Sequence, residues 1–564
     1  MGHSQSSQSK IEEKDKIIIS DQIIYALNQK EKTAKIMRTR DAHGLISISR
    51  SIKFENKEFI ITSVSNGAFK DLMRIISVKF SPDSELQTIE KYAFMNSSIE
   101  YISIPSTVTR ICEGAFALCK ELKQITIPTN SKLQTIESYA FICAPIESFT
   151  IPSSVVELQE CWCSMTTDLK KVKVLENNQN FISKDDKFIL GKTDEKSDNF
   201  DVLIFVSREL KSVIIPNNIT KIASSAFSGS EIESIEICPN VKEICQGAFF
   251  HCEKLEQVMI HRDSELRIIG REAFLRTSIE SIFIPCRVTK ICKDAFSDCK
   301  SLHKVEFDKN SELEIIEKGA FKNSVIRSIS IPSKVIKLEE GWCSNTVELK
   351  SVTVSRNNPN FISIDDKFIF GKKDENSDDF EVLVFACRDI KEYKIPPNIT
   401  RIASNAFESS SIRRITFPAQ LKEIGKNAFA SCDSLRFIEI PGNSELRIIG
   451  KNAFKYTKIN NIIIPKTVTQ ICESAFAFCE ELRRIEIEQN SSLEAIGNEA
   501  FKFSSIESIF IPGSVNTIGT NVFDSCDNLI IVEFENESQY SSTNEQFQDL
   551  ESHVYVKHFL KHQK

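Results

Sequence analysis

The chain has 564 residues, more than one hydrophobic core usually organises, so it contains either several domains or an array of repeats. Its hydrophobic fraction of 41% and charged fraction of 26% are ordinary for a globular protein. A net charge of −7 and a pI of about 5.8 exclude the basic footprint of a nucleic-acid-binding protein.

Residues 1–65 lack the repeat described below, and we expect a polar tail followed by a cap over the first coil. This segment has no apolar core of the kind that secretory signals carry, and no apolar run in the chain is long enough for a transmembrane helix. A cytoplasmic location is therefore one expectation. Gly2 and Ser6 match the loose pattern for N-myristoylation, which offers peripheral membrane attachment as an alternative to a plain polar start.

Residues 66–535 carry an Ala-Phe pair in steps that alternate between 25 and 22 residues, as from Phe69 to Phe94 and on to Phe116. Trp162 and Trp342 replace the Phe once in each of two blocks, and their spacing of 180 residues indicates a duplicated block. A period of 22 to 25 residues is typical of leucine-rich repeats and is shorter than the helical repeats.

Each repeat also carries a strand sequence, such as SIEYISIP at 98–105, and we count about 19 of them. Its alternation points Ile99, Ile102 and Ile104 inward, and the closing proline ends the strand because it has no N–H to donate. The sequence therefore predicts an α/β solenoid. Its expected form is a leucine-rich-repeat horseshoe with a long parallel concave β-sheet and short turns or helical turns on the convex side.

Two related segments, 180–206 and 360–386, interrupt the repeat and are predicted to be β-hairpin inserts. The loop of the first insert holds Asp194, Glu195 and Asp198, which we interpret as a solvated loop in preference to a Ca²⁺ site because no EF-hand spacing is present. Residues 536–564 are expected to form the C-terminal cap and tail.

The 17 cysteines follow the repeat rather than a disulfide or zinc pattern. Cys112 and Cys119 flank the Ala-Phe pair in ICEGAFALC, whereas Gly425 replaces the first cysteine in IGKNAFASC. A disulfide or metal site would not tolerate the loss of one partner, so we interpret these residues as buried, reduced core thiols.

The recurring pattern, as in IPSTVTRICEGAFALCKELKQITIP at 104–128 and IPKTVTQICESAFAFCEELRRIEI at 464–487, resembles the BspA-like class of leucine-rich repeats. The NFIS-DD-FI inserts and the lead-in FENKEFIITSVSNGAF at 54–69 are similar to that family as well. The resemblance implies the solenoid fold and a surface antigen or adhesin that recognises host or matrix proteins. Many relatives carry a signal peptide or membrane anchor, and this sequence departs from them in showing neither.

The sequence contains no pattern that indicates an enzyme. Its eight histidines lie outside any metalloprotease or zinc-site spacing, and no Gly-rich phosphate loop occurs, so we expect no catalytic residues, no metal and no cofactor.

Binding to a protein ligand is the function that the outward strand positions favour. In the first two blocks these positions are mostly Glu, Lys, Ser and Thr, but in the last third Arg and large apolar residues replace them. Such residues are enriched at protein interfaces. The alternative is that Glu439 and Glu486 neutralise neighbouring arginines while the Phe rings pack along the sheet. The predicted ligand-binding residues are Arg413, Arg414, Arg436, Phe437, Ile463, Arg483, Arg484 and Phe510. An adhesin or surface antigen is thus expected, with an intracellular interaction scaffold as the alternative.

Overall fold

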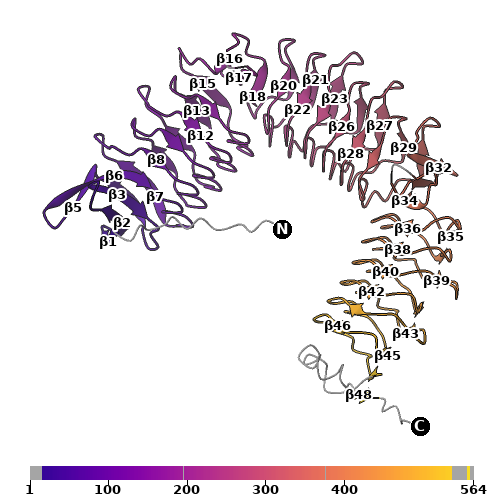
Figure 1. Cartoon of the computed structure of the whole chain (residues 1–564). Coiled ribbons are helices and arrows are strands. Elements are labelled where there is room, and N and C mark those ends of the chain that lie inside the picture. Colours follow the sequence, from indigo (N-terminus) through magenta and orange to yellow (C-terminus); the bar gives the residue numbers. More distant parts are fainter. Residues whose placement is uncertain (1–14, 195, 375–376, 536–554, 559–564) are drawn as a thin grey trace. The chain divides into compact units, whose positions relative to one another are not determined.

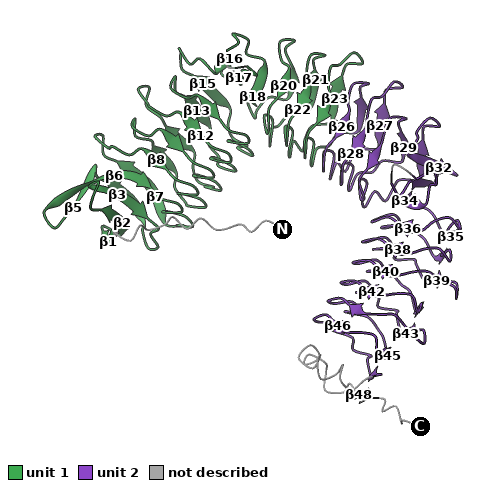
Figure 2. Ribbon diagram, viewed as in Figure 1, with its two compact units in different colours: residues 1–279 green, residues 280–564 purple. Residues whose placement is uncertain are grey.

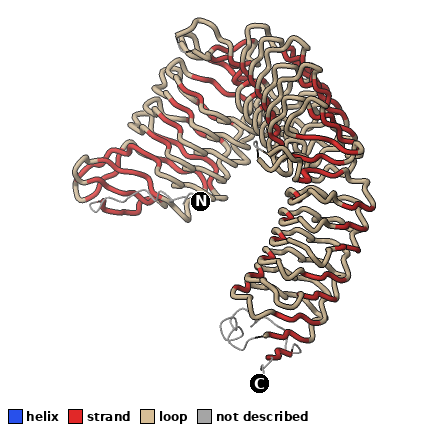
Figure 3. Tube along the Cα trace, turned by 45° about the vertical axis from the view of Figure 1, so that its right-hand side comes forward, coloured by secondary structure: helices blue, strands red, loops and turns tan. Residues whose placement is uncertain are grey.

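The computed structural model describes residues 15–194, 196–374, 377–535 and 555–558. These residues form β-strands, turns and loops and contain no helix, as Figure 3 shows. The chain divides into two compact units, Met1–Ile279 and Glu280–Lys564, each of which is described by itself (Figure 2). In both units the chain winds into stacked coils, and the described part holds about 22 of them rather than the 19 expected from the strand sequences (Figure 1).

Unit 1 begins with a group of mainly antiparallel strands. They are β1 (Asp15–Ser20), β2 (Ile23–Asn28), β3 (Thr33–Met37), β5 (Ser51–Phe54) and β6 (Lys57–Val64). β1, β2 and β3 pair antiparallel in turn, β5 pairs antiparallel with β6, and β3 pairs parallel with β6. β6 then pairs parallel with β8 (Thr88–Ile89), which places this group against the first coils.

A regular coil carries one strand of three to six residues and one strand of two residues. In unit 1 the longer strands are β4 (Gly44–Ile48), β7 (Ile75–Phe80), β9 (Tyr101–Ser103), β11 (Gln124–Thr126), β13 (Ser148–Ile151), β15 (Lys171–Val174), β19 (Ser212–Ile214), β21 (Ser234–Ile237) and β23 (Gln257–Ile260). In unit 2 they are β25 (Ser281–Ile284), β27 (Lys304–Phe307), β29 (Ser328–Ile331), β31 (Ser351–Val354), β35 (Glu392–Lys394), β37 (Arg414–Thr416), β39 (Phe437–Glu439), β41 (Asn461–Ile464), β43 (Arg484–Ile487), β45 (Ser508–Ile511), β47 (Ile531–Phe534) and β48 (Tyr555–His558). We call the surface that these strands form the long-strand face.

The long-strand face is not the one long parallel sheet that the repeat predicts. The longer strands do pair in parallel, but they form separate sheets of two to five strands, such as β35-β37-β39 and β41-β43-β45-β47-β48. The physical reason lies in the alternating coil length. The segment that follows a longer strand is alternately short and long, as 105–111 and 128–136 show. The hydrogen bonds between neighbouring longer strands are therefore not the same at every coil.

The two-residue strands form parallel ladders of their own, which the sequence analysis did not anticipate. In unit 1 they are β8, β10 (Arg110–Ile111), β12 (Thr135–Ile136), β14 (Glu157–Leu158), β20 (Lys221–Ile222), β22 (Glu243–Ile244) and β24 (Ile268–Ile269). In unit 2 they are β26 (Lys290–Ile291), β28 (Ile315–Ile316), β30 (Lys337–Leu338), β36 (Arg401–Ile402), β38 (Glu423–Ile424), β40 (Ile448–Ile449), β42 (Gln470–Ile471), β44 (Ala495–Ile496) and β46 (Thr517–Ile518).

The segments 180–206 and 360–386 each hold three strands. They are β16 (Ile182–Lys184), β17 (Phe188–Gly191) and β18 (Val202–Val206) in the first, and β32 (Phe361–Ile364), β33 (Phe368–Gly371) and β34 (Val382–Ala386) in the second. Neighbouring strands within each segment pair antiparallel. The last strand of each segment then pairs parallel with the next two-residue strand, β18 with β20 and β34 with β36.

The turn that contains the Ala-Phe pair, here called the Ala-Phe corner, is not helical, so of the expected short turns or helical turns the described residues show only turns. Its N–H groups donate alternately to the next coil and to a carbonyl three positions back in the same coil, not four positions back as in an α-helix. Phe94 N–H donates to the Ala115 carbonyl at 2.7 Å, and Tyr92 N–H donates to the Glu113 carbonyl at 2.9 Å. Tyr92 and Asn96 adopt positive φ values of 57° and 55°, which turn these N–H groups outward along the stack.

The core of each unit runs along the stack of coils. The predicted inward residues Ile99, Ile102 and Ile104 are buried, and so are Ala115 and Phe116 of the same repeat. The Phe rings of successive corners stack face to face, with centroids 5.0 Å apart for Phe69–Phe94 and 5.1 Å apart for Phe94–Phe116. Because each coil hides its neighbour's apolar side chains, the coils stabilise one another.

Candidate functional site

The residues predicted to bind a ligand lie on or directly before the strands β37 to β45, on the long-strand face. The strand alternation places one side chain in the core and the next in solvent, as in the buried Ile462 and the exposed Ile463 of β41. Phe437, Ile463 and Phe510 are 46%, 51% and 38% exposed. Each belongs to a different coil, so the face presents apolar side chains at intervals along unit 2.

Arg414 and Phe437 occupy paired positions on β37 and β39. The Arg414 guanidinium lies over the Phe437 ring, 4.7 Å from its centroid, and Nη1 donates to Glu439 Oε1 at 2.7 Å. Thr416 Oγ1 donates to the other Glu439 oxygen at 2.8 Å. The hydrogen bonds from Thr416 and Arg414 hold the pKa of Glu439 below its usual value. The charge of Arg414 is therefore already compensated within the chain.

Arg436 is compensated as well, by a residue two coils further on. Its Nη1 lies 2.5 Å from Glu481 Oε2, and Lys458 Nζ lies 3.9 Å from Glu481 Oε1. This pairing joins the coils of β39, β41 and β43 along the border of the long-strand face.

Three predicted arginines stay uncompensated. Arg413, Arg483 and Arg484 are exposed, and no carboxylate of the described residues lies within ion-pair distance of them. Arg484 is paired in register with Asn461, two residues before Ile463 on β41. The structure thus separates the eight predicted residues into two paired arginines, three free arginines and three exposed apolar side chains.

A row of aromatic rings that was not predicted from the sequence lies on the Ala-Phe corners of unit 2. Tyr456 stacks on Phe478 with centroids 4.7 Å apart, and Phe478 stacks on Phe503 at 4.8 Å. All three adopt positive φ, and Tyr456 and Phe503 are 46% and 43% exposed. They follow the buried corner Phe by two positions, a place held in other coils by residues as different as Asn96, Leu118 and Arg276. That spacing is visible in the sequence and could have identified them.

Exposed apolar residues also occur on the long-strand face of unit 1, where the sequence analysis emphasised polar ones. Tyr101, Ile214 and Met259 are 47%, 71% and 59% exposed. Tyr101 lies on the sheet β11-β9-β7-β4, and Ile214 and Met259 lie on the sheet β19-β21-β23. No arginine accompanies these three side chains on their strands, whereas in unit 2 arginines and apolar residues follow one another on consecutive coils. The combination of arginines with exposed apolar side chains therefore favours the long-strand face of unit 2 as the candidate binding site.

No group of three or more His, Cys, Asp or Glu side chains is placed to hold a metal ion in the described part of the chain. Asp194 of the first insert uses Oδ1 to accept the Lys196 N–H at 3.0 Å, and His261 Nε2 lies 3.0 Å from Glu236 Oε1. Within the described ranges, no helix has the length and hydropathy needed to cross a membrane. Gly2 lies outside the described residues.

The repeat of the chain matches the model of a known protein family. The family described as "BspA type Leucine rich repeat region (6 copies)" matches residues 47–183, 199–310, 267–373, 375–482 and 447–555. This family is a repeat scaffold, and the match indicates no catalytic family. No functionally curated protein matches the sequence significantly.

Several solved structures are similar to the chain. A leucine-rich cell surface protein from Faecalibacterium prausnitzii is 20% identical, with 93% of this chain and 97% of that chain covered and a TM-score of 0.40. The pneumococcal vaccine antigen PcpA is 18% identical, with 97% and 94% covered and a TM-score of 0.37. A leucine-rich repeat protein from Bacteroides ovatus is 18% identical, with 96% and 100% covered and a TM-score of 0.34. Because the family matches cover most of the sequence, this chain belongs to the BspA-type leucine-rich repeat proteins.

Proposed function

We propose that the chain is a non-catalytic protein that binds a protein ligand through the long-strand face of unit 2, on strands expected from the sequence to form the concave sheet. Leucine-rich repeat proteins generally bind proteins through such repeated surfaces. The observation that carries the proposal is a set of uncompensated arginines and exposed apolar side chains on consecutive coils. The set comprises Arg413, Arg483, Arg484, Phe437, Ile463 and Phe510.

The chemistry of these six side chains indicates what kind of surface the partner should present. An exposed side chain such as Ile463 gains free energy when a partner removes it from water, at about 25 cal/mol per Å² of apolar area. A free guanidinium such as that of Arg484 can form a two-pronged hydrogen bond with a carboxylate. The partner surface should therefore present acidic side chains around an apolar centre.

A surface antigen or adhesin that recognises host or matrix proteins is the finer form of this proposal. It requires the long-strand face of unit 2 to be accessible outside the cell. Protease treatment of intact cells, followed by blotting for the chain, tests this form. Cleavage on intact cells would support it, and full protection that is lost only after lysis would rule it out.

An intracellular interaction scaffold is the alternative, and the thiols favour it. All 17 cysteines are free in the structure, including Cys143 and Cys286, which are not fully buried. Unpaired cysteines at this density are typical of a reducing compartment. The same protease experiment separates the two locations, because a scaffold stays protected in intact cells.

The binding face is tested by reversing two free charges, Arg413→Glu and Arg484→Glu, in one variant. We expect partner capture to weaken by at least about tenfold while thermal unfolding changes little, because both side chains are exposed and unpaired. The matched control is Lys300→Glu with Lys309→Glu, which reverses two exposed lysines of the same unit that lie off this set. Equal capture by the arginine variant and the control would rule out this face.

Photo-crosslinking adds a test that does not depend on charge. A photoreactive residue at Ile463 should crosslink to the partner, whereas the same residue at Lys309 should not. Crosslinks from Lys309 alone would place the binding face elsewhere.

A further inference from the structure

The regular stacking of coils is interrupted in unit 2 where the insert with β32, β33 and β34 enters. We call this place the second seam. β30 is the last strand of its ladder, and the next two-residue strand, β36, pairs with β34 instead. In a regular stack the backbone N–H of a corner Phe donates to the Ala carbonyl of the next corner, but the Ala406 carbonyl accepts instead from the Ala386 N–H of β34 at 3.0 Å. Side chains connect the coil before the insert with the coil after it. Ser409 Oγ donates to Asn345 Oδ1 at 3.1 Å, and Arg401 forms an ion pair with Glu340.

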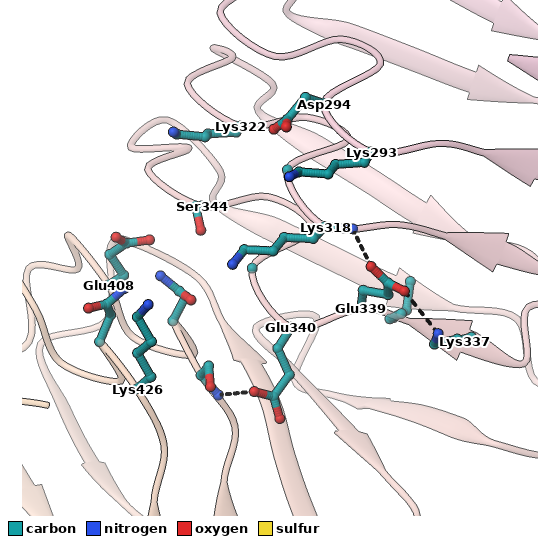
Figure 4. Close-up of a pocket in the computed structure, with 16 residues that line it drawn as sticks. Lys293, Asp294, Lys318, Lys322, Lys337, Glu339, Glu340, Ser344, Glu408 and Lys426 are labelled. Atoms are coloured by element: carbon teal, nitrogen blue, oxygen red, sulfur yellow. Dashed lines mark hydrogen bonds and ion pairs between the residues drawn. The ribbon is translucent and has the colours of Figure 1, made fainter. Parts of the chain in front are cut away.

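The second seam holds a pocket of about 730 Å³, shown in Figure 4. This volume lies in the range of small-molecule sites in proteins. Lysines line it from both sides of the seam: Lys318 reaches into it from one side and Lys426 from the other, with Ser344 between them (Figure 4).

Two of the four acidic side chains that line the pocket already have cationic partners. Lys337 donates to Glu339 at 2.9 Å, and the Lys318 N–H donates to the other Glu339 oxygen at 2.9 Å. These bonds, that from Lys337 foremost, keep the pKa of Glu339 below its usual value. For Glu340, burial opposes ionisation, but hydrogen bonds from Ser404 and Arg401 outweigh it and lower the pKa.

Four lysines of the pocket have no such partner. No carboxylate of the described residues lies within ion-pair distance of their ammonium groups, and the remaining acids of the pocket are Asp294 and Glu408. The four are Lys293, Lys318, Lys322 and Lys426. A pocket with an excess of free ammonium groups attracts an anion.

Glu408 adds a second feature to the pocket. Its Oε2 atom is buried and accepts no hydrogen bond from the described residues. A buried carboxylate oxygen needs a donor, since an unmade hydrogen bond there is costly. Glu408 is near enough to the buried Arg388 for electrostatic attraction, but the Oε2 atom is left without a donor. Because the residue as a whole is only partly buried and lines the pocket, a rotation of its side chain brings this oxygen to a ligand hydroxyl.

The first block provides an internal comparison, because its ladder breaks in the same way after β14. The pocket of that seam is smaller, at about 240 Å³. The positions 180 residues before the four lysines are occupied by Glu113, Ser138, Ile142 and Gln246. The interruption of the stack therefore does not require the lysines, and their presence at the second seam calls for another explanation.

We propose that the second seam binds a small anion that also carries hydroxyl groups, namely a phosphate or sulfate ester of a sugar. Lys318 and Lys426 bind the ester oxygens from opposite sides, and Lys293 and Lys322 raise the local positive potential. Glu408 accepts a hydrogen bond from a ligand hydroxyl. Asn405, Asn427 and Ser344 line the same pocket and offer further polar contacts.

The test is isothermal titration of the full chain with a hexose bisphosphate and with a sulfated disaccharide. We expect one of the two to bind at one site, and the preferred probe identifies the type of ester. The variant Lys318→Ser with Lys426→Gln introduces the residues of the first seam, which are compatible with this fold. It should bind at least about tenfold more weakly, because two charge-assisted contacts to the ester oxygens are lost. The control Lys300→Ser with Lys309→Gln should bind like the unaltered chain.

Glu408→Gln tests the hydroxyl contact separately. It should weaken binding of the sugar ester relative to inorganic pyrophosphate, which has no carbon-bound hydroxyl. Circular dichroism melting of each variant checks that the coils remain stacked. Failure of both esters to bind the unaltered chain, or unchanged binding by the Lys318/Lys426 variant, would overturn the proposal.

Discussion

The thiol of Cys119 donates to the carbonyl oxygen of Phe94, one coil earlier, at 3.0 Å. Cys252, Cys432, Cys479 and Cys526 repeat this contact with the Phe of their own preceding coils, at 3.0 to 3.1 Å. Ser or Thr fills the same position in most other coils, as Ser97 does beside Cys119, and Ala144 fills it in one. The cysteines are thus part of a polar ladder inside the core, which explains why they can alternate with serine.

Alkaline pH should destabilise the fold through these thiols. Burial raises the pKa of Cys119 and of Cys479 from 9.0 to about 11. The unfolded chain ionises at the ordinary pKa and the folded chain does not, so the stabilising contribution is complete below pH 9 and is lost as pH rises toward 11. Urea unfolding should therefore show decreasing stability across this window. Cys119→Ser with Cys479→Ser should flatten the decrease, and an equal decrease in that variant would contradict the assignment.

The stacked Phe rings should dominate the stability of each coil. Phe429 is fully buried between Phe407 and Phe454, with ring centroids at 4.9 and 5.3 Å. Phe429→Ala should reduce stability by roughly 3–5 kcal/mol, because it removes buried area and leaves a cavity. Phe429→Leu retains most of the volume and should cost less. Denaturant unfolding of both variants measures which loses more stability. A Leu variant as unstable as the Ala variant would show that ring stacking contributes more to stability than side-chain volume does.

Gly450 should not tolerate a side chain, because its coil lies close to the one before it. A Cβ atom at Gly450 would come within 2.6 Å of the Ile424 carbonyl oxygen. Gly450→Ala should therefore cost about 1–3 kcal/mol. Gly442 is a matched control from the same coil, since a Cβ there meets nothing within 4 Å, and Gly442→Ala should be neutral or slightly stabilising. Comparable melting temperatures for the two variants would contradict this difference.

The repeat made much of the core predictable. Ile99, Ile102, Val108 and Phe116 are buried as their periodicity indicates. The corner conformation was not predictable by the same means. Leu118 adopts a φ of 58°, a backbone conformation that favours glycine over leucine. Leucine is held in this conformation because hydrogen bonds to the next coil fix the backbone.

The candidate sites were predictable only in part. Arg413 and Arg414 are adjacent in sequence and similar in type, yet one is free and the other is paired with Glu439 across the coils. The pocket of the second seam depends on where a ladder breaks, and it joins residues as distant as Lys293 and Lys426. Neither property follows from local sequence, because both arise from which coils are neighbours.

The difference between Arg413 and Arg414 gives a prediction for partner binding that rests on the proposed function. Arg413→Ala removes a free charge, so it should slow association and reduce the dependence of binding on salt. Arg414→Ala removes a charge that Glu439 already compensates and a contact to the Phe437 ring, so its main effect should be a stability loss of roughly 0.5–1 kcal/mol. Association kinetics at two salt concentrations measure the effect on binding, and urea unfolding of the same variants measures the effect on stability. If Arg414→Ala slowed association more than Arg413→Ala, the compensated arginine would be the one that meets the partner.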